Sequence, residues 1–472
     1  MFNKEEFKEN AQYIIDWITD YFSNVENFPV RSQLSYGEVK KSISSEAPLV
    51  AEAFDVILND FQTKIFPGIT HWQSPKYFAY FPANNSIPSV FAEFLTAALG
   101  IQGMKWITSP AATELEEVVT DWLRTMIGLS DQFKGVIQDT ASVASLCAIL
   151  AARERITDFQ SNSKGISGEK IRVYCSDEAH SSVEKAVRIA GIGSDNLVKI
   201  KVDTGCRMLS SDLEKAIEED LSKGYKPACI VGALGTTGTC AIDPIAEIAR
   251  IAEKFNIWFH IDAAFAGTAL ILPEFRNSID GYARADSFVL NPHKWMFTNF
   301  DCSVLYVKDE KQFQQTFRLV PHYLQTNIDN EVNDYSNWGI QLGRRFRSLK
   351  LWFVVRSFGV KGLQDKIRDH ILLAEYFENE IKKSKWFELT VPRNLAVVCF
   401  RFKPEFQSGS ENLDQMNAIL LERINKSGEA YMSHSIVNGK FTLRFVCAQT
   451  NTEKKHVDEA LKLIFSLADE MT

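Results

Sequence analysis

From residue 134 onward, short apolar runs alternate with longer segments of helical periodicity. Runs rich in β-branched and other apolar residues occupy 135–138, 171–176, 197–202, 228–235, 257–265, 287–292 and 302–307. Amphipathic segments separate several of these runs and occupy 141–156, 180–190, 210–222 and 244–255. Alternation of strands and helices is typical of a parallel sheet with helices on both faces. The pattern therefore predicts an α/β domain with a mostly parallel, seven-stranded sheet.

The sequence on either side of this alternation has a different pattern. Residues 1–84 predict two or three helices and a proline-rich passage, and residues 86–130 predict further helices. After a long helical region at about 343–385, the strand candidates 395–402 and 441–446 lie among helices, which indicates a smaller α+β domain. We therefore divide the chain into an N-terminal helical segment (1–84), a large α/β domain (85–351) and a small C-terminal α+β domain (352–472).

Composition and charge narrow the class of function. The chain has 472 residues, of which 45% are apolar and 24% charged, as in an ordinary globular protein. Its net charge of −8 and the lack of a basic tract argue against nucleic acid or an anionic membrane as the main partner. No run of 18 apolar residues occurs, and the acidic, amphipathic N-terminus differs from a signal peptide. The eight cysteines include no CxxC pair, which predicts reduced core thiols and a cytoplasmic protein.

Candidate polar residues follow the apolar runs, where ligands of open α/β sheets bind. The stretch DTASVAS (139–145) opens a helix whose first amides can hold a phosphate, although an ordinary Ser/Thr cap is the simpler interpretation of this stretch alone. His180 follows the second run as either a functional imidazole or a capping residue. Asp262 ends a strongly apolar run, where it is either a buried carboxylate that needs a cation or a helix N-cap.

Lys294 lies in the apolar stretch LNPHKW (290–295). Burial disfavours its charged form and makes the amine a usable nucleophile, whereas the alternative is a lysine whose long stem reaches water. Taken in order along one sheet, a phosphate cradle, a flat stacking residue, a carboxylate and a buried lysine fit pyridoxal 5′-phosphate. The lysine would form a Schiff base, the carboxylate would pair with the pyridinium nitrogen, and the helix end would hold the phosphate.

Several long motifs occur in the order of a known family. They include HWQSPKYFAYFPA (71–83), TSPAATELE (108–116), DEAHSSVEKA (177–186), LGTTGTCAID (234–243), FHIDAAFAG (259–267), ADSFVLNPHKWM (285–296) and LGRRFRSLKLW (342–352). Over nearly its whole length the chain resembles the group II pyridoxal-phosphate decarboxylases, and within them the aromatic-L-amino-acid decarboxylases. The resemblance implies a type I aminotransferase-like fold and a homodimer with active sites at the subunit interface.

The resemblance also implies roles for individual residues. It makes Lys294 the Schiff-base lysine, Asp262 the partner of the pyridinium proton, His180 the residue that stacks on the ring and contacts the substrate carboxylate, and Tyr323 the proton donor on a mobile loop. It places Thr237 near the phenolic oxygen of the cofactor. The implied phosphate contacts are Ala141, Ser142, Asn291 and His293. The implied substrate pocket contains Trp72, Tyr80, Phe81 and Pro82, together with Met104 and Gly343. No metal site is expected.

The sequence departs from the family pattern at a few positions. Asp139 stands where many relatives have glycine, and its carboxylate would repel a phosphate unless it points away. Met104 and Gly343 predict a pliable, roomy pocket that accepts an indole. The expected reaction is decarboxylation of tryptophan, phenylalanine, tyrosine or a hydroxylated derivative to the arylalkylamine and CO₂.

Three other functions are weighed against this expectation. Aldehyde synthases couple decarboxylation to oxidative deamination, but they typically replace the loop tyrosine or the stacking histidine, whereas Tyr323 and His180 are present here. Decarboxylases of acidic amino acids need polar or cationic contacts at the side-chain end, where this chain offers an apolar wall. A cofactor-free scaffold would be expected to have lost Lys294, Asp262 or His180.

Overall fold

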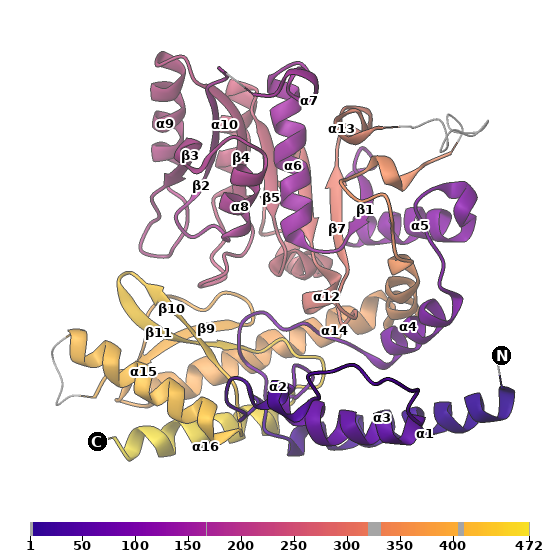
Figure 1. Cartoon of the computed structure of the whole chain (residues 1–472). Coiled ribbons are helices and arrows are strands. Elements are labelled where there is room, and N and C mark those ends of the chain that lie inside the picture. The colour runs from indigo at the N-terminus through magenta and orange to yellow at the C-terminus, as the bar shows by residue number, and fades with distance from the viewer. Residues whose placement is uncertain (1–2, 167, 320–331, 405–409, 472) are drawn as a thin grey trace.

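The computed structural model describes residues 3–166, 168–319, 332–404 and 410–471. Figure 1 shows a larger sheet with its covering helices in the upper half of the molecule and a smaller sheet below it. The helices that precede the larger sheet are α1 (Lys4–Asn24), α2 (Glu38–Ser42), α3 (Phe54–Asp60), α4 (Ile87–Leu99) and α5 (Pro110–Met126). Helix α1 runs along the lower edge of the molecule and has no buried residue.

The larger sheet has the seven strands that the apolar runs predicted. They are β1 (Lys134–Gln138), β2 (Ile171–Ser176), β3 (Leu197–Ile200), β4 (Lys226–Ala233), β5 (Trp258–Asp262), β6 (Ser287–Leu290) and β7 (Ser303–Val307). Their order in the sheet is β1-β7-β6-β5-β4-β2-β3, and β7 alone runs antiparallel to its two neighbours. The prediction of a mostly parallel sheet is confirmed.

Helices cover both faces of this sheet, so that its strands are buried on both sides. Helices α6 (Ala141–Ile156), α8 (Ser182–Ile189) and α13 (Glu310–Phe317) pack on one face, and α5, α9 (Ser210–Ser222) and α10 (Ile245–Phe255) pack on the other. Successive residues of a strand point to opposite faces. In β2, Val173 and Cys175 accordingly join the core with Ile149 of α6, whereas Tyr174 joins the core with Ile217 of α9.

The smaller sheet is antiparallel and lies near the C-terminus. Its strands are β8 (Phe387–Leu389), β9 (Val397–Phe402), β10 (Ser433–Val437) and β11 (Lys440–Val446), in the order β10-β11-β9-β8. Helices α14 (Arg347–Lys383), α15 (Ser410–Ser427) and α16 (Lys454–Asp469) accompany it. The backbone of α14 leaves helical geometry at Gly359, where φ is 65°. This arrangement agrees with the predicted C-terminal α+β unit, and it adds β8 and β10 to the two predicted strands.

Short helices connect the strands of the larger sheet. They are α7 (Ser161–Lys164), α11 (Pro273–Arg276) and α12 (Pro292–Trp295). Within the described ranges, no helix combines the length and the apolar character needed to cross a membrane. All eight cysteines are buried and free, as the sequence predicted.

Candidate active site

Lys294 lies on α12, a helix of four residues that directly follows β6. Pro292 occupies the first turn, where its fixed φ favours a helix start. The turn is also held from the N-terminal segment by Asn84. The backbone N–H of Asn84 donates to the carbonyl oxygen of His293 (3.0 Å), and its side-chain amide donates to the carbonyl oxygens of Lys294 and Ala448. Sequence reasoning missed Asn84.

The Lys294 amine is in an apolar environment. Burial lowers the pKa of Lys294, and the carboxylate of Asp262 partly opposes this shift. Its Nζ lies 5.2 Å from the centre of the Phe81 ring. Within the described structure, Lys294 forms no ion pair with a carboxylate. The lowered pKa favours the uncharged amine, which is the form that acts as a nucleophile.

Asp262 and His180 follow two strands of the larger sheet, β5 and β2, which are separated by β4, and both share the electrostatic environment of Lys294. Asp262 ends β5, and its Oδ1 accepts the backbone N–H of Ala264 at 3.1 Å. His180 follows β2, and its Nδ1 accepts the backbone N–H of Ser182 at 3.1 Å. Because Nδ1 is an acceptor, the neutral ring carries its proton on Nε2. Burial lowers the pKa of His180, and Asp262 opposes that shift while Lys294 adds to it.

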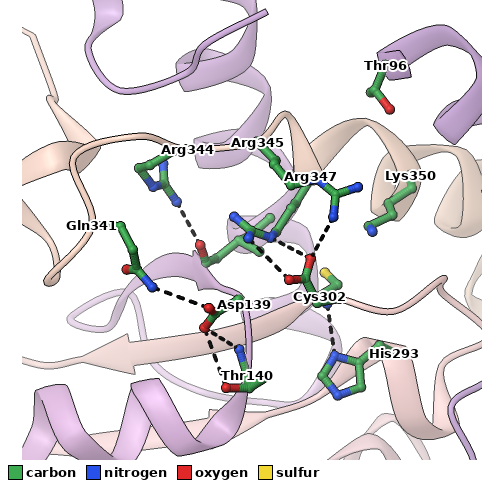
Figure 2. Close-up of polar contacts among 12 residues, drawn as sticks. Thr96, Asp139, Thr140, His293, Cys302, Gln341, Arg344, Arg345, Arg347 and Lys350 are labelled. Atoms are coloured by element: carbon green, nitrogen blue, oxygen red, sulfur yellow. Dashed lines mark hydrogen bonds and ion pairs between the residues drawn. The ribbon is translucent and has the colours of Figure 1, made fainter. Parts of the chain in front are cut away.

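The start of α6 offers backbone amides for an anion. Ala141 and Ser142 are its first two residues, and the N–H groups of the first turn of a helix have no intrahelical partner. Asp139 comes just before this turn. Its Oδ1 accepts the backbone N–H of Thr140 (2.7 Å), and its Oδ2 accepts the Nε2–H of Gln341 (3.4 Å), as Figure 2 shows. The carboxylate therefore has donors of its own on both oxygens.

Asn291 and His293 lie on the segment that carries Lys294, and each accepts a hydrogen bond from the residues at the start of β7. Ser303 Oγ donates to Asn291 Oδ1 at 2.7 Å. The backbone N–H of Cys302 donates to His293 Nδ1 at 2.9 Å (Figure 2), so Nε2 carries the proton of the neutral ring. Burial, with a contribution from Lys294, lowers the pKa of His293 to about 3. His293 is thus a neutral donor and not a cation near neutral pH.

Arg444 links the turn that carries Thr237 to the segment that carries Tyr80. Its Nε donates to the carbonyl oxygen of Gly238 (2.6 Å), one terminal nitrogen donates to that of Thr237 (2.8 Å), and the other donates to Ser433 Oγ (2.8 Å). Ser433 Oγ also accepts the backbone N–H of Tyr80 at 3.0 Å. Burial lowers the pKa of Arg444. An arginine within an apolar strand is a signal that sequence reasoning left without a role.

The four expected wall residues lie close together before α4. The Phe81 ring stacks on Phe265 with 4.0 Å between centroids, and Trp72 lies 6.4 Å from Tyr80 in a stacked orientation. Trp72 and Tyr80 are 37% and 51% exposed, so this aromatic surface is accessible, whereas Pro82 is buried. Tyr431, which sequence reasoning missed, places its hydroxyl 3.4 Å from that of Tyr80.

Met104 and Gly343 lie near each other. The backbone N–H of Gly103 donates to the carbonyl oxygen of Arg344 (2.9 Å), and a Cβ at Gly343 would lie 3.0 Å from Nε2 of Gln102. Within the part of the chain that the structure describes, no hydrogen bond or ring contact connects either residue with the wall. Tyr323 lies outside the described residues.

Comparisons with known proteins agree with this fold. Residues 37–403 match the family model of the pyridoxal-dependent decarboxylase conserved domain. Tryptophan decarboxylase 2 of Oryza sativa subsp. japonica is 44% identical, over 99% of this chain and 95% of that protein. Phenylacetaldehyde synthase of Arabidopsis thaliana is 43% identical, over 98% of this chain and 96% of that protein. The crystal structure of Oryza sativa TDC with PLP and tryptamine matches with a TM-score of 0.96 at 36% identity, covering 100% of this chain and 99% of that one.

The chain belongs to the pyridoxal-dependent decarboxylase family, which confirms the expected fold class, the enzyme class and the cofactor, pyridoxal 5′-phosphate. The described residues fit this cofactor: a buried amine without a carboxylate in ion-pair contact, a carboxylate at a strand end, and unpaired amides at the start of α6. Lys294, Asp262 and the amides of Ala141 and Ser142 would hold its three functional parts. When bound, the cofactor supplies a conjugated sink for the electron pair left at Cα after CO₂ departs.

Proposed function

We propose that this protein decarboxylates an aromatic L-amino acid, namely tryptophan, phenylalanine, tyrosine or a hydroxylated derivative, to the arylalkylamine and CO₂. The observation that carries this proposal is the aromatic wall beside the reactive amine, where Phe81 lies 5.2 Å from Lys294 Nζ. Apolar and aromatic surface binds an aromatic side chain well and gives a carboxylate no partner. The similarity to tryptophan decarboxylase 2 of rice supports the same substrate class.

The arginine beside this wall does not favour an acidic substrate. Arg444 lies 5.5 Å from the Phe81 ring, but each of its three nitrogens already donates a hydrogen bond to a protein oxygen. These three bonds fix the guanidinium against protein oxygens, so only two of its five N–H groups remain for a substrate carboxylate. We therefore place decarboxylation of glutamate or a similar amino acid below that of an aromatic one.

We further propose a role for each residue of the site. Lys294 would bind the cofactor covalently, Asp262 would keep its pyridinium nitrogen protonated by charge pairing, and His180 would cover the ring and direct its Nε2–H toward the substrate carboxylate. The phosphate would take hydrogen bonds from Ala141, Ser142, Asn291 and His293. Thr237 would approach the phenolic oxygen.

Delivery of a proton to Cα requires an acid that reaches the site after CO₂ has left. We assign this role to Tyr323. An unperturbed tyrosine has a pKa near 10, so it arrives protonated at neutral pH. The similarity to phenylacetaldehyde synthase of Arabidopsis makes aldehyde formation the second candidate. The presence of both Tyr323 and His180 favours the amine.

We further propose a homodimer in which a second copy brings its Met104 and Gly343 to the wall of the first. A surface of exposed apolar side chains supports this arrangement, because such a surface on a monomer is unfavourable in water. It comprises Phe91, Phe94, Leu95, Leu99, Ile107, Ile340 and Leu342. Helix α1, which carries an exposed Tyr13, would add to the interface.

The division into segments 1–84, 85–351 and 352–472 is part of the same proposal, as is a cytoplasmic location. Eight free, buried thiols support the latter, since oxidising compartments favour disulfides.

A panel of substrates tests the proposed function. The purified protein, loaded with pyridoxal 5′-phosphate, is given L-tryptophan, L-phenylalanine, L-tyrosine, their hydroxylated forms and L-glutamate, and the amines are measured side by side. We expect kcat/KM to be highest for an aromatic substrate. A higher kcat/KM for glutamate would contradict the proposal.

A further inference from the structure

The helical turn that carries Lys294 depends on bonds from outside itself. Helix α12 has only four residues, and such a short helix is not stable alone. Asn84 bonds the carbonyl oxygens of its third and second residues, and Cys302 bonds the ring of His293. Trp295, the residue after the reactive lysine, is held by a third contact.

Trp295 belongs to an aromatic column that ends beneath the Lys294 amine. The column consists of Trp295, Phe265 and Phe81. The centroids of Trp295 and Phe265 are 4.6 Å apart with ring planes within 5°, and those of Phe265 and Phe81 are 4.0 Å apart within 10°. Lys294 Nζ lies 5.2 Å from the Phe81 ring. The amine lies over the face of the Phe81 ring, so the orientation of this ring affects where the amine rests.

The other end of the column is fixed by His370, on the second half of α14. The indole Nε1–H of Trp295 donates to His370 Nδ1 at 3.0 Å, and both side chains are fully buried. An indole N–H can only donate, so Nδ1 must be unprotonated. Burial, with a contribution from Lys366, lowers the pKa of His370 to about 3. The acceptor is therefore present throughout the neutral pH range.

We propose that His370 is a positioning residue for Lys294: it fixes the Trp295 indole, and with it the aromatic column and the direction of the lysine amine. The inference rests on the proposed role of Lys294 as the lysine that binds the cofactor. His370 does not touch Lys294 itself. It acts on the lysine only through the side chains of the aromatic column.

The test uses His370→Phe, which keeps a ring but removes the acceptor, in the enzyme loaded with pyridoxal 5′-phosphate. The first readout is visible circular dichroism of the bound cofactor, which reports how the cofactor is oriented in its site. The second is kcat and KM measured separately. We expect a weakened dichroic band and a fall in kcat of about tenfold or more at nearly unchanged KM, since a misplacement of about 1 Å can cost about 10²-fold.

A double-mutant cycle with Trp295→Phe separates positioning from loss of stability. If His370 acts through the indole, then His370→Phe changes the dichroic band and kcat in the wild type but adds little in the Trp295→Phe background. His370→Asn, whose side-chain oxygen takes the place of Nδ1, is expected to restore the wild-type band. Equal effects of His370→Phe in both backgrounds would overturn the proposal.

A matched control comes from the same helix. Leu363 is fully buried in α14 and lies outside the aromatic column. Leu363→Ala is expected to lower thermal stability and leave the dichroic band unchanged, and an equal change in the band would refute the specific role of His370. Lys294→Ala tests the underlying assignment separately: a variant that kept the wild-type cofactor band would overturn the role of Lys294 itself.

Discussion

Asn84 connects three parts of the chain at the reactive lysine, so its replacement is expected to be costly. Its side chain is 1% exposed, donates to the carbonyl oxygens of Lys294 and Ala448, and accepts the backbone N–H of Thr450 at 3.0 Å. Asn84→Ala leaves these three backbone groups without that partner. At about 1–1.5 kcal/mol for each of the three hydrogen bonds, the free energy of unfolding should fall by about 3–4.5 kcal/mol.

In the variant Asn84→Asp, the free energy of unfolding is expected to depend on pH. The introduced carboxylate can still accept from Thr450, but it faces two carbonyl oxygens in a buried site, so its pKa in the folded protein rises above the unfolded value of about 3.9. Between these two pKa values the folded state binds more protons than the unfolded state. The free energy of unfolding therefore falls as the pH rises through this window. The variant should be least stable at alkaline pH, where the group is ionised.

Urea denaturation at one mildly acidic and one mildly alkaline pH measures both effects. The matched control is Asn85→Ala, because the side chain of Asn85 makes no hydrogen bond within the described structure. A loss of stability in Asn84→Ala no larger than that in Asn85→Ala would refute the reasoning. So would a difference between Asn84→Asp and the wild type that does not grow with pH.

Three further predictions concern the chemistry of the site. Lys294→Ala should lose the visible absorbance band of the lysine-bound cofactor and nearly all turnover, as absorbance and amine assays would show; normal turnover would remove Lys294 from its role. Asp262→Asn should lower turnover more than cofactor occupancy, because the phosphate contacts are separate from the carboxylate, and full activity would contradict this. Tyr323→Phe should lose most amine and gain aldehyde, ammonia and hydrogen peroxide; unchanged amine output would show that Tyr323 only packs.

The strands of the larger sheet could be predicted because each is a nearly continuous apolar run. Strand β10, with the sequence SHSIV, could not, since its buried Ser433 is polar and its exposed Ile436 is apolar, the reverse of the usual pattern of a half-buried strand. Strand β8 has only three residues, which is too short for a pattern. Both strands form because β9 and β11 offer them hydrogen-bonding edges, and a tertiary edge leaves no trace in local sequence.

The residues of the site also differ in how far the sequence alone could reveal them. Lys294, Asp262 and His180 could be found because polar residues directly after apolar strands are conspicuous and meet at one edge of the sheet. In the sequence, Asn84 in PANNS looks like an ordinary loop residue, and His370 looks like any other position of a long helix. Their importance comes from partners more than 70 residues away in sequence.

The balance of products tests the central claim most directly. The wild-type enzyme, loaded with pyridoxal 5′-phosphate and supplied with its best aromatic substrate in air-saturated buffer, is assayed together for CO₂, arylalkylamine, aldehyde and hydrogen peroxide. An aromatic amino acid decarboxylase releases amine and CO₂ in equal amounts, with no peroxide above that of the Lys294→Ala control. Aldehyde and peroxide in amounts that match the CO₂ would contradict the account and identify an aldehyde synthase instead.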